Sequence, residues 1–231
     1  INDTLDINSD KKHPYKKYRP IAAGRISIRK AIISSSLIFA GSLFLAFSIN
    51  NISAYIILIY FFIQIAYCLR LKNEPILDIF CISSGFLLRA IAGVKSSNLD
   101  FSPWFLLSIG LLALFLAIEK RKAELQHVIE MKIQTRKSLN RYSLSLLHRI
   151  ESIVSTSAFM SYSLWAVGTS TNGSSKGSML ISIPFVLLGI FRYQLITDPK
   201  ERERREIYNP NINPEKPEEI LLSDKGILFS I

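Results

Sequence analysis

Six long apolar runs constrain this chain more than any other feature of its 231 residues. Most of the runs approach the ~20 residues that a helix needs to cross a bilayer. A backbone in lipid must satisfy its own hydrogen bonds, so the runs predict helices rather than strands. The sequence therefore predicts an all-α, polytopic integral membrane bundle, with a soluble helical bundle as the alternative. The runs span residues 31–49, 52–69, 76–94, 103–118, 150–168 and 179–197.

The basic residues are distributed unevenly between the segments that separate these runs. If the N-terminal segment lies in the cytoplasm and each run crosses once, the inner segments hold 24 of the 28 Lys and Arg residues. Those inner segments are residues 1–30, 70–75, 119–149 and 198–225. This asymmetry follows the positive-inside rule. The net charge of +10 therefore indicates membrane topology, and we expect no nucleic-acid partner.

The N-terminal segment combines carboxylates with bases. Asp3, Asp6 and Asp10 are spaced i, i+3 and i+7, which on a helix places them within roughly 60° of one another. Carboxylate oxygens suit Mg²⁺, and Asn2 adds an amide oxygen beside them. A block of bases suited to phosphate oxygens follows: Lys11, Lys12, Lys16, Lys17 and Arg19. The pattern favours a Mg²⁺–diphosphate site, and the alternative is a charged loop that is simply solvated.

The same residues resemble a known family. Asn-Asp-x-x-Asp-x-x-x-Asp over residues 2–10, followed by Arg19-Pro20, is similar to the first Asp-rich motif of the UbiA-type prenyltransferase superfamily. The longer form, with His13-Pro14 and the string of residues 20–24, resembles its decaprenyl-phosphate phosphoribosyltransferase branch. Further matching positions are Ala66-Tyr67-Cys68, Leu71-Lys72, Asp78, residues 88–93, Trp104–Leu107, residues 120–125, Arg136–Leu139, Tyr142, Pro217-Glu218 and Asp224.

The resemblance implies a fold of nine membrane helices around a cavity that opens to the cytoplasm. The chain begins with Ile rather than Met, and it ends as another apolar run opens. We therefore expect residues 1–231 to form a single transmembrane transferase domain that lacks two helices at its start and most of the ninth at its end. Residues 1–30 and 119–149 would be its cytoplasmic active-site segments, in the inner membrane of a bacterium.

The resemblance also implies a reaction, in which 5-phosphoribose passes from phosphoribosyl diphosphate to a polyprenyl phosphate to give a cell-wall precursor. Asp3, Asp6 and Asp10 would be the catalytic residues that hold Mg²⁺. The substrate-binding residues would be Asn2, Lys16, Lys17, Arg19, Tyr67, Lys72, Lys120, Arg121, Glu124 and Arg136. The oligomeric state stays open, with a homo-oligomer as one alternative.

The second inner segment separates the competing functions. Prenyl-transferring members of the superfamily usually carry a second Asp-rich motif there, whereas this chain has Glu119-Lys-Arg-Lys-Ala-Glu124. Glu in place of Asp, with three bases, favours a phosphoribosyl donor. A prenyltransferase acting on an aromatic or other small acceptor would need a metal-binding carboxylate pair, which Glu119 and Glu124 match only in part. A non-catalytic lipid transporter would need broken helices, for which residues 83–85 offer one kink.

Two ionisable residues lie within apolar runs. Such residues usually face the interior of the bundle or a wet cavity. Asp78 is near the inner end of its run, where its side chain could also reach water. Arg89 lies deeper, and an ion pair, a contact with backbone carbonyls and a contact with substrate all stay open. Cys68 and Cys81 are expected to be packing residues.

Overall fold

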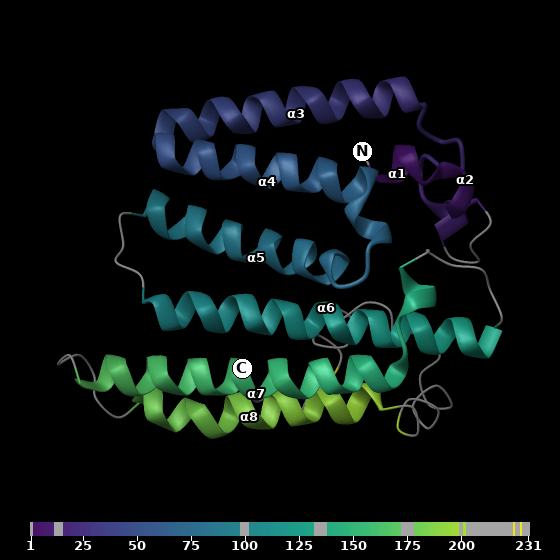
Figure 1. Ribbon diagram of the computed structural model, residues 1–231. Coiled ribbons are helices and arrows are strands. Elements are labelled where there is room, and N and C mark those ends of the chain that lie inside the picture. Colours follow the sequence, from purple (N-terminus) through teal and green to yellow (C-terminus); the bar gives the residue numbers. More distant parts are fainter. Residues whose placement is uncertain are drawn as a thin grey trace. The chain divides into compact units, whose positions relative to one another are not determined.

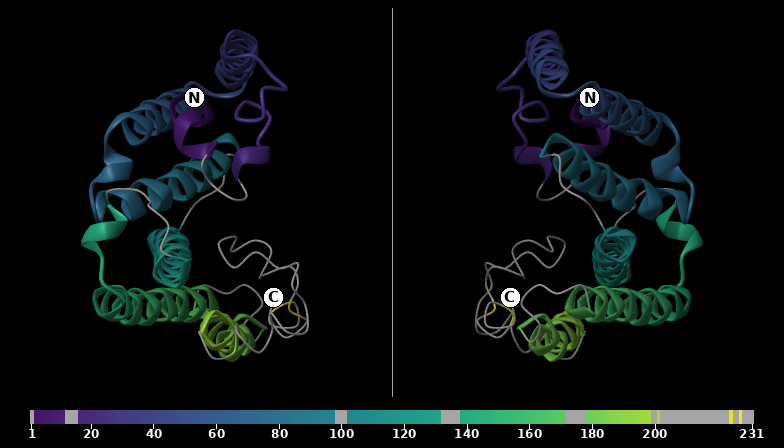
Figure 2. Two further views of the ribbon diagram at one scale, coloured as in Figure 1. Left: turned by 90° about the vertical axis from the view of Figure 1, so that its right-hand side faces the viewer. Right: turned by 90° about the vertical axis from the view of Figure 1, so that its left-hand side faces the viewer.

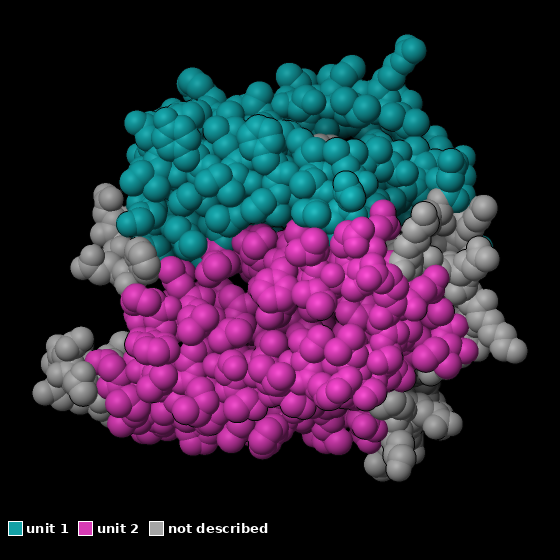
Figure 3. Space-filling view, viewed as in Figure 1, with its two compact units in different colours: residues 1–72, 88–99 teal, residues 73–87, 100–231 magenta. Residues whose placement is uncertain are grey.

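The computed structural model describes residues 2–11, 16–97, 102–131, 138–171 and 178–198, together with residues 201, 224 and 227. Two compact units make up the chain (Figure 3): residues 1–72 with 88–99, and residues 73–87 with 100–231. Every regular element among the described residues is a helix. The predicted all-α class is confirmed.

The first unit is built around an antiparallel helix pair, α3 (Ile28–Ile49) and α4 (Asn51–Leu69), which Figure 1 shows side by side. Asn50 joins the two helices. Its side-chain oxygen accepts a backbone N–H in the first turn of α4 at 2.8 Å, and its amide donates to the Lys95 carbonyl at 3.2 Å. Lys95 belongs to the C-terminal part of helix α5 (Leu77–Ser96). Asn50 therefore ties three helices together.

The N-terminal segment of the first unit contains three short helices: α1 (Asn2–Leu5), α2 (Ile7–Asp10) and η1 (Lys16–Tyr18). A turn then leads the chain into α3. Gly24 adopts a φ of 74° in this turn, which a residue without a Cβ does at little cost. The Arg25 N–H donates to the Pro20 carbonyl at 2.9 Å. This turn separates the N-terminal segment from the first membrane-length helix.

The second unit contains the N-terminal part of α5, then α6 (Pro103–Met131), η3 (Leu139–Arg141), α7 (Leu144–Thr171) and α8 (Ser178–Thr197). The short helix η2 (Leu71–Asn73) precedes α5. Helix α7 packs against both α6 and α8 (Figures 1 and 2). The core between these helices is apolar and includes Ile79, Phe115, Ile118, Leu147 and Tyr193.

Five of the described helices are long and apolar enough to cross a membrane: α3, α4, α5, α6 and α8. Large apolar side chains cover the outside of α3, where Ile38 and Phe44 are each 72% exposed. Such surfaces suit lipid rather than water. The chain is an integral membrane protein. The sixth predicted run, residues 150–168, is also helical but is not among the five, because serine and threonine recur along it.

Three details of these helices bear on the sequence analysis. Helix α6 continues beyond the apolar run of residues 103–118 as far as Met131. Cys68 and Cys81 are both free and buried. Helix α5 is unbroken through residues 83–85, whereas a transporter would need a broken helix. Instead, the Ser83 hydroxyl donates to the Gly110 carbonyl of α6 at 2.7 Å.

Candidate active site

Asp3 and Asp10 lie on the short helices α1 and α2, and Asp6 lies between the two helices. The Asp10 N–H donates to the Asp6 carbonyl at 2.8 Å, and the Asp6 N–H donates to the Asn2 carbonyl at 3.0 Å. The helix bends at Asp6, between α1 and α2. The backbone of residues 2–10 is therefore helical on both sides of a bend at Asp6.

Two bases of the same unit contact the three carboxylates. The Arg19 Nη1 donates to Asp3 Oδ1 at 2.8 Å and to Asp10 Oδ2 at 3.1 Å. The Lys72 Nζ donates to Asp6 Oδ1 at 2.5 Å. We call Asn2, Asp3, Asp6, Asp10, Arg19 and Lys72 the aspartate cluster. Sequence spacing alone did not reveal the pairing of Lys72 with Asp6, because 66 residues separate the two.

The aspartate cluster has the ligand chemistry that a hard divalent cation requires. The Asn2 Oδ1 is buried and has no hydrogen-bond partner in the described part of the chain. Carboxylate and amide oxygens are the ligands that Mg²⁺ prefers. No group of three or more His, Cys, Asp or Glu side chains in the described ranges converges closely enough to hold a metal ion. The oxygens fit the ion chemically, but they are arranged around Arg19 and Lys72.

The other bases of the first segment are placed less specifically. The Lys17 Nζ lies 5.1 Å from the centroid of the Tyr18 ring, and both side chains are exposed. Lys16 begins η1, but its side chain lies outside the description. Tyr67 is half-buried near the C-terminal end of α4. Lys12, His13 and Pro14 lie outside the described residues, and so does Arg136.

The second inner segment contains a buried ion pair that sequence reasoning missed. The Arg121 side chain is 1% exposed, and its Nε donates to Asp78 Oδ2 at 2.7 Å. Its Nη1 donates to Glu124 Oε2. Asp78 is fully buried, so its carboxylate does not reach water. The rule that buried charges in a membrane pair with one another would have predicted a basic partner for Asp78, but not which one.

Tyr142 completes this network. Its hydroxyl donates to Asp78 Oδ1 at 2.7 Å and accepts the Ile76 N–H at 2.5 Å. Ile76 has a φ of 71°, a strained conformation for a β-branched residue. Burial and the hydrogen bond to Asp78 raise the pKa of Tyr142 above its ordinary value, so the phenol stays protonated at neutral pH. We call Ile76, Asp78, Arg121, Glu124 and Tyr142 the Asp78 network.

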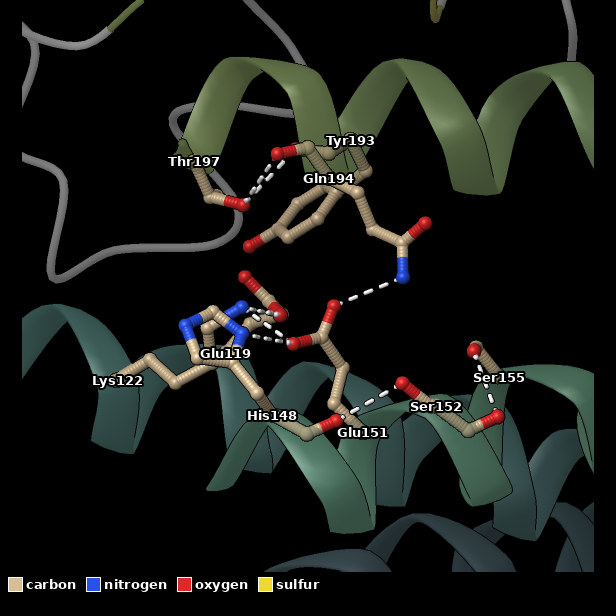
Figure 4. Close-up of polar contacts among 9 residues, drawn as sticks. All are labelled: Glu119, Lys122, His148, Glu151, Ser152, Ser155, Tyr193, Gln194 and Thr197. Atoms are coloured by element: carbon tan, nitrogen blue, oxygen red, sulfur yellow. Dashed lines mark hydrogen bonds and ion pairs between the residues drawn. The ribbon is translucent and has the colours of Figure 1, made fainter. Parts of the chain in front are cut away.

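A second buried network joins α6, α7 and α8 (Figure 4). The Lys122 Nζ donates to Glu119 Oε1 at 2.8 Å and also to Glu151 Oε2. The Gln194 amide donates to Glu151 Oε1 at 2.8 Å, and His148 Nδ1 lies 3.4 Å from Glu151 Oε2. Glu119 Oε2 is buried without a hydrogen-bond partner among the described residues. These five residues form the Lys122 network.

The Asp78 network and the Lys122 network contain most of the charged residues between Glu119 and Glu124. Glu119 and Glu124 contact different bases, Lys122 and Arg121, and they are not part of a described metal-binding group. Glu119 and Glu124 therefore each pair with a different base. Lys120 and Glu124, at i and i+4 on α6, are only half-buried, whereas the residues between them are buried.

Arg89 lies in the membrane-crossing part of α5. Its guanidinium carbon is 5.3 Å from the centroid of the Tyr60 ring on α4. A cation above an aromatic face is attracted by the negative charge of that face. Arg89 therefore makes a cation–π contact between α4 and α5, which the sequence-based alternatives did not include.

Comparison with known proteins relates the chain to one family. The UbiA prenyltransferase family matches residues 1–210 of the chain. The chain is 39% identical over 166 residues to a decaprenyl-phosphate phosphoribosyltransferase of Mycolicibacterium smegmatis, covering 72% of this chain and 52% of that protein. It is 33% identical over 229 residues to the protein of the same name from Corynebacterium glutamicum, covering 97% of this chain and 65% of that protein. The chain thus spans between half and two thirds of the length of these relatives.

The fold is also found among solved structures. A UbiA homolog from Archaeoglobus fulgidus, bound to GPP and Mg²⁺, superimposes with a TM-score of 0.69 at 17% identity. The match covers 84% of this chain and 68% of the other. At that identity the similarity is one of fold, and it agrees with the helical architecture described above.

Proposed function

Because the chain belongs to the UbiA prenyltransferase family, we propose that it is part of a Mg²⁺-dependent membrane transferase with phosphoribosyl diphosphate as donor. The acceptor is a polyprenyl phosphate, and the product is a phosphoribosylated lipid phosphate. The names of the two relatives support this choice of substrates. The observation that carries the proposal is the aspartate cluster, where oxygen ligands for a metal contact two bases suited to phosphate.

The reaction exchanges one bond at the anomeric carbon of the donor. The bond from this carbon to the diphosphate oxygen breaks, and a bond to an oxygen of the lipid phosphate forms. The acceptor is already an anion, so the protein needs no strong general base and acts mainly by positioning the two substrates. When bound, Mg²⁺ supplies positive charge to the diphosphate as it leaves.

The residues of the aspartate cluster divide between the metal and the diphosphate. Asn2, Asp3 and Asp6, with Asp10, would provide the oxygen ligands. Arg19 and Lys72 would then move from these carboxylates to the diphosphate oxygens, because the metal takes over the neutralisation of the aspartates. Without the metal the cluster has three carboxylates and two bases in contact, which leaves one negative charge in excess. That excess negative charge would favour the binding of a divalent cation at these oxygens.

The remaining bases would hold the other phosphates. Lys16 and Lys17 adjoin Arg19 and suit the donor, while Lys120 and Arg136 of the second segment are candidates for the donor 5-phosphate or the lipid phosphate. Tyr67 would line the same substrate. We place the active site on the cytoplasmic face of the bacterial inner membrane, where the positive-inside distribution of 24 of 28 Lys and Arg residues puts the inner segments.

The test uses membranes that contain the full-length natural protein. They are incubated with ribose-labelled phosphoribosyl diphosphate and polyprenyl phosphate, with and without a chelator of divalent cations. We expect label in the lipid fraction only when Mg²⁺ is present. Transfer from a labelled prenyl diphosphate to a small aromatic acceptor, with none from phosphoribosyl diphosphate, would overturn the proposal in favour of a prenyltransferase. Absence of transfer from either donor would leave a lipid transporter as the better explanation.

A further inference from the structure

Residues 119–124 of the second inner segment fall into two groups that differ in burial. Glu119, Arg121 and Lys122 are buried. Arg121 contacts Asp78 of α5, Lys122 contacts Glu151 of α7, and Glu119 contacts Lys122. Lys120 and Glu124 are half-buried on one face of α6. This less buried face, which we call the accessible face of α6, is therefore distinct from the face that anchors the helix.

Arg121 connects Glu124 to the anchoring face. Arg121 donates from Nη1 to Glu124 Oε2 and from Nε to Asp78 Oδ2, so its position is set by both carboxylates. The guanidinium plane fixes the angle between these two hydrogen bonds. A displacement of Asp78 would consequently be transmitted to Glu124.

Asp78 is in turn held by Tyr142, which lies in the same inner segment, residues 119–149. The Tyr142 hydroxyl donates to Asp78 and accepts from Ile76, the one non-glycine residue of the described chain with a positive φ. A buried ion pair contributes little net stability. A strained backbone persists only where the surrounding contacts enforce it, and such strain concentrates at functional sites. Fixed geometry, rather than stability, is what this arrangement provides.

We infer that Asp78 and Tyr142 are positioning residues for the transfer reaction, acting through Arg121 to hold Glu124 and the accessible face of α6 in place. The inference rests on the proposed function and adds two residues to it that do not themselves contact substrate. Arg121 becomes the link between the anchor and the site instead of a phosphate ligand. The strained turn at Ile76 is held by the same tyrosine.

The test compares Tyr142→Phe with wild type in the full-length protein, measuring kcat, the KM for phosphoribosyl diphosphate and the melting temperature. Phe keeps the ring but removes both hydrogen bonds. We expect kcat per folded molecule to fall by about 10- to 100-fold, because small displacements in a positioned site are costly. The donor KM should change by less than about threefold, since the phosphate-binding bases are untouched. Tyr162→Phe is the matched control, because its hydroxyl pairs with Ser182 at 2.7 Å elsewhere in the same unit.

A second variant separates positioning from simple support of the fold. Ile76→Gly removes the strain at the positive φ, because glycine adopts it freely. In the Tyr142→Phe background, Ile76→Gly should restore the melting temperature while kcat stays low. If kcat returns together with the melting temperature, or if Tyr142→Phe keeps the kcat of wild type per folded molecule, the inference is wrong. If wild type itself transfers no phosphoribose, the proposed function fails and the inference fails with it.

Discussion

Replacing Lys122 by methionine removes the only lysine or arginine that is described as contacting either Glu119 or Glu151. Met has a similar length and no charge, so the change tests the charge of the Lys122 network more than its packing. The Glu119 side chain is 1% exposed and that of Glu151 is 6% exposed, so water reaches neither carboxylate well. Lys122→Met therefore leaves two buried carboxylates close together with no ammonium between them.

The size of the effect follows from burial. Removing one partner of a buried ion pair costs about 3–5 kcal/mol, because the remaining charge is uncompensated. Glu151→Gln should cost far less, about 1 kcal/mol, because Lys122 keeps Glu119 as a partner of opposite charge. For a protein of this size, each kcal/mol shifts the melting temperature by roughly 2–4 °C. Lys122→Met should thus melt roughly 6–20 °C below wild type, and Glu151→Gln only a few degrees below.

The assay is thermal unfolding of the full-length protein in mild detergent. Lys30→Met is the matched control, because the Lys30 side chain is exposed at the start of α3 and should matter by less than about 0.5 kcal/mol. The order expected is a large loss for Lys122→Met, a small loss for Glu151→Gln and almost none for Lys30→Met. If Lys122→Met and Glu151→Gln lower the melting temperature equally, the charge argument is refuted.

Two further variants test the first unit. Arg19→Gln should weaken the binding of inorganic diphosphate with Mg²⁺ by about tenfold or more, because a charge-assisted hydrogen bond is lost. The same variant should bind Mn²⁺ alone more tightly, because Asp3 and Asp10 lose their competing cation. Calorimetry measures both affinities, with exposed Arg25→Gln as control, and a change of the same sign in both would contradict the proposed exchange. Asn50→Ala should destabilise the protein by about 1–2 kcal/mol, because the cap of α4 and the hydrogen bond to α5 are both lost. Asn51→Ala, at the neighbouring exposed residue, should have little effect in the same melting assay. Equal losses of melting temperature in the two variants would argue against the capping role of Asn50.

The helices could be predicted because lipid imposes a strict rule on the backbone. Long apolar runs become helices whatever their packing, so residues 31–49 and 179–197 fall within α3 and α8 as expected. The aspartate spacing likewise predicts the helical backbone of residues 2–10, because that pattern is local. The bend at Asp6 carries no comparable signal in the sequence.

The partners of the charged residues could not be predicted, because they depend on packing between distant segments. Asp78 and Arg121 are 43 residues apart, and nothing in either run specifies the other. The sequence indicates that the three bases at residues 120–122 form one phosphate-binding block. Arg121 instead belongs to the Asp78 network, and Lys122 to the Lys122 network. Helical periodicity separates neighbouring residues onto different faces, but the sequence does not state which face meets α5 and which meets α7.

Transfer by aspartate variants tests the central claim most directly. Membranes containing full-length Asp3→Ala, Asp6→Ala or wild-type protein are supplied with ribose-labelled phosphoribosyl diphosphate, polyprenyl phosphate and Mg²⁺, with exposed Asp198→Ala as the matched control. We predict that Asp3→Ala and Asp6→Ala insert into the membrane normally but put no label into lipid, while Asp198→Ala transfers as wild type does. Transfer at the wild-type rate by either Asp3→Ala or Asp6→Ala would contradict the assignment of the aspartate cluster as the active site.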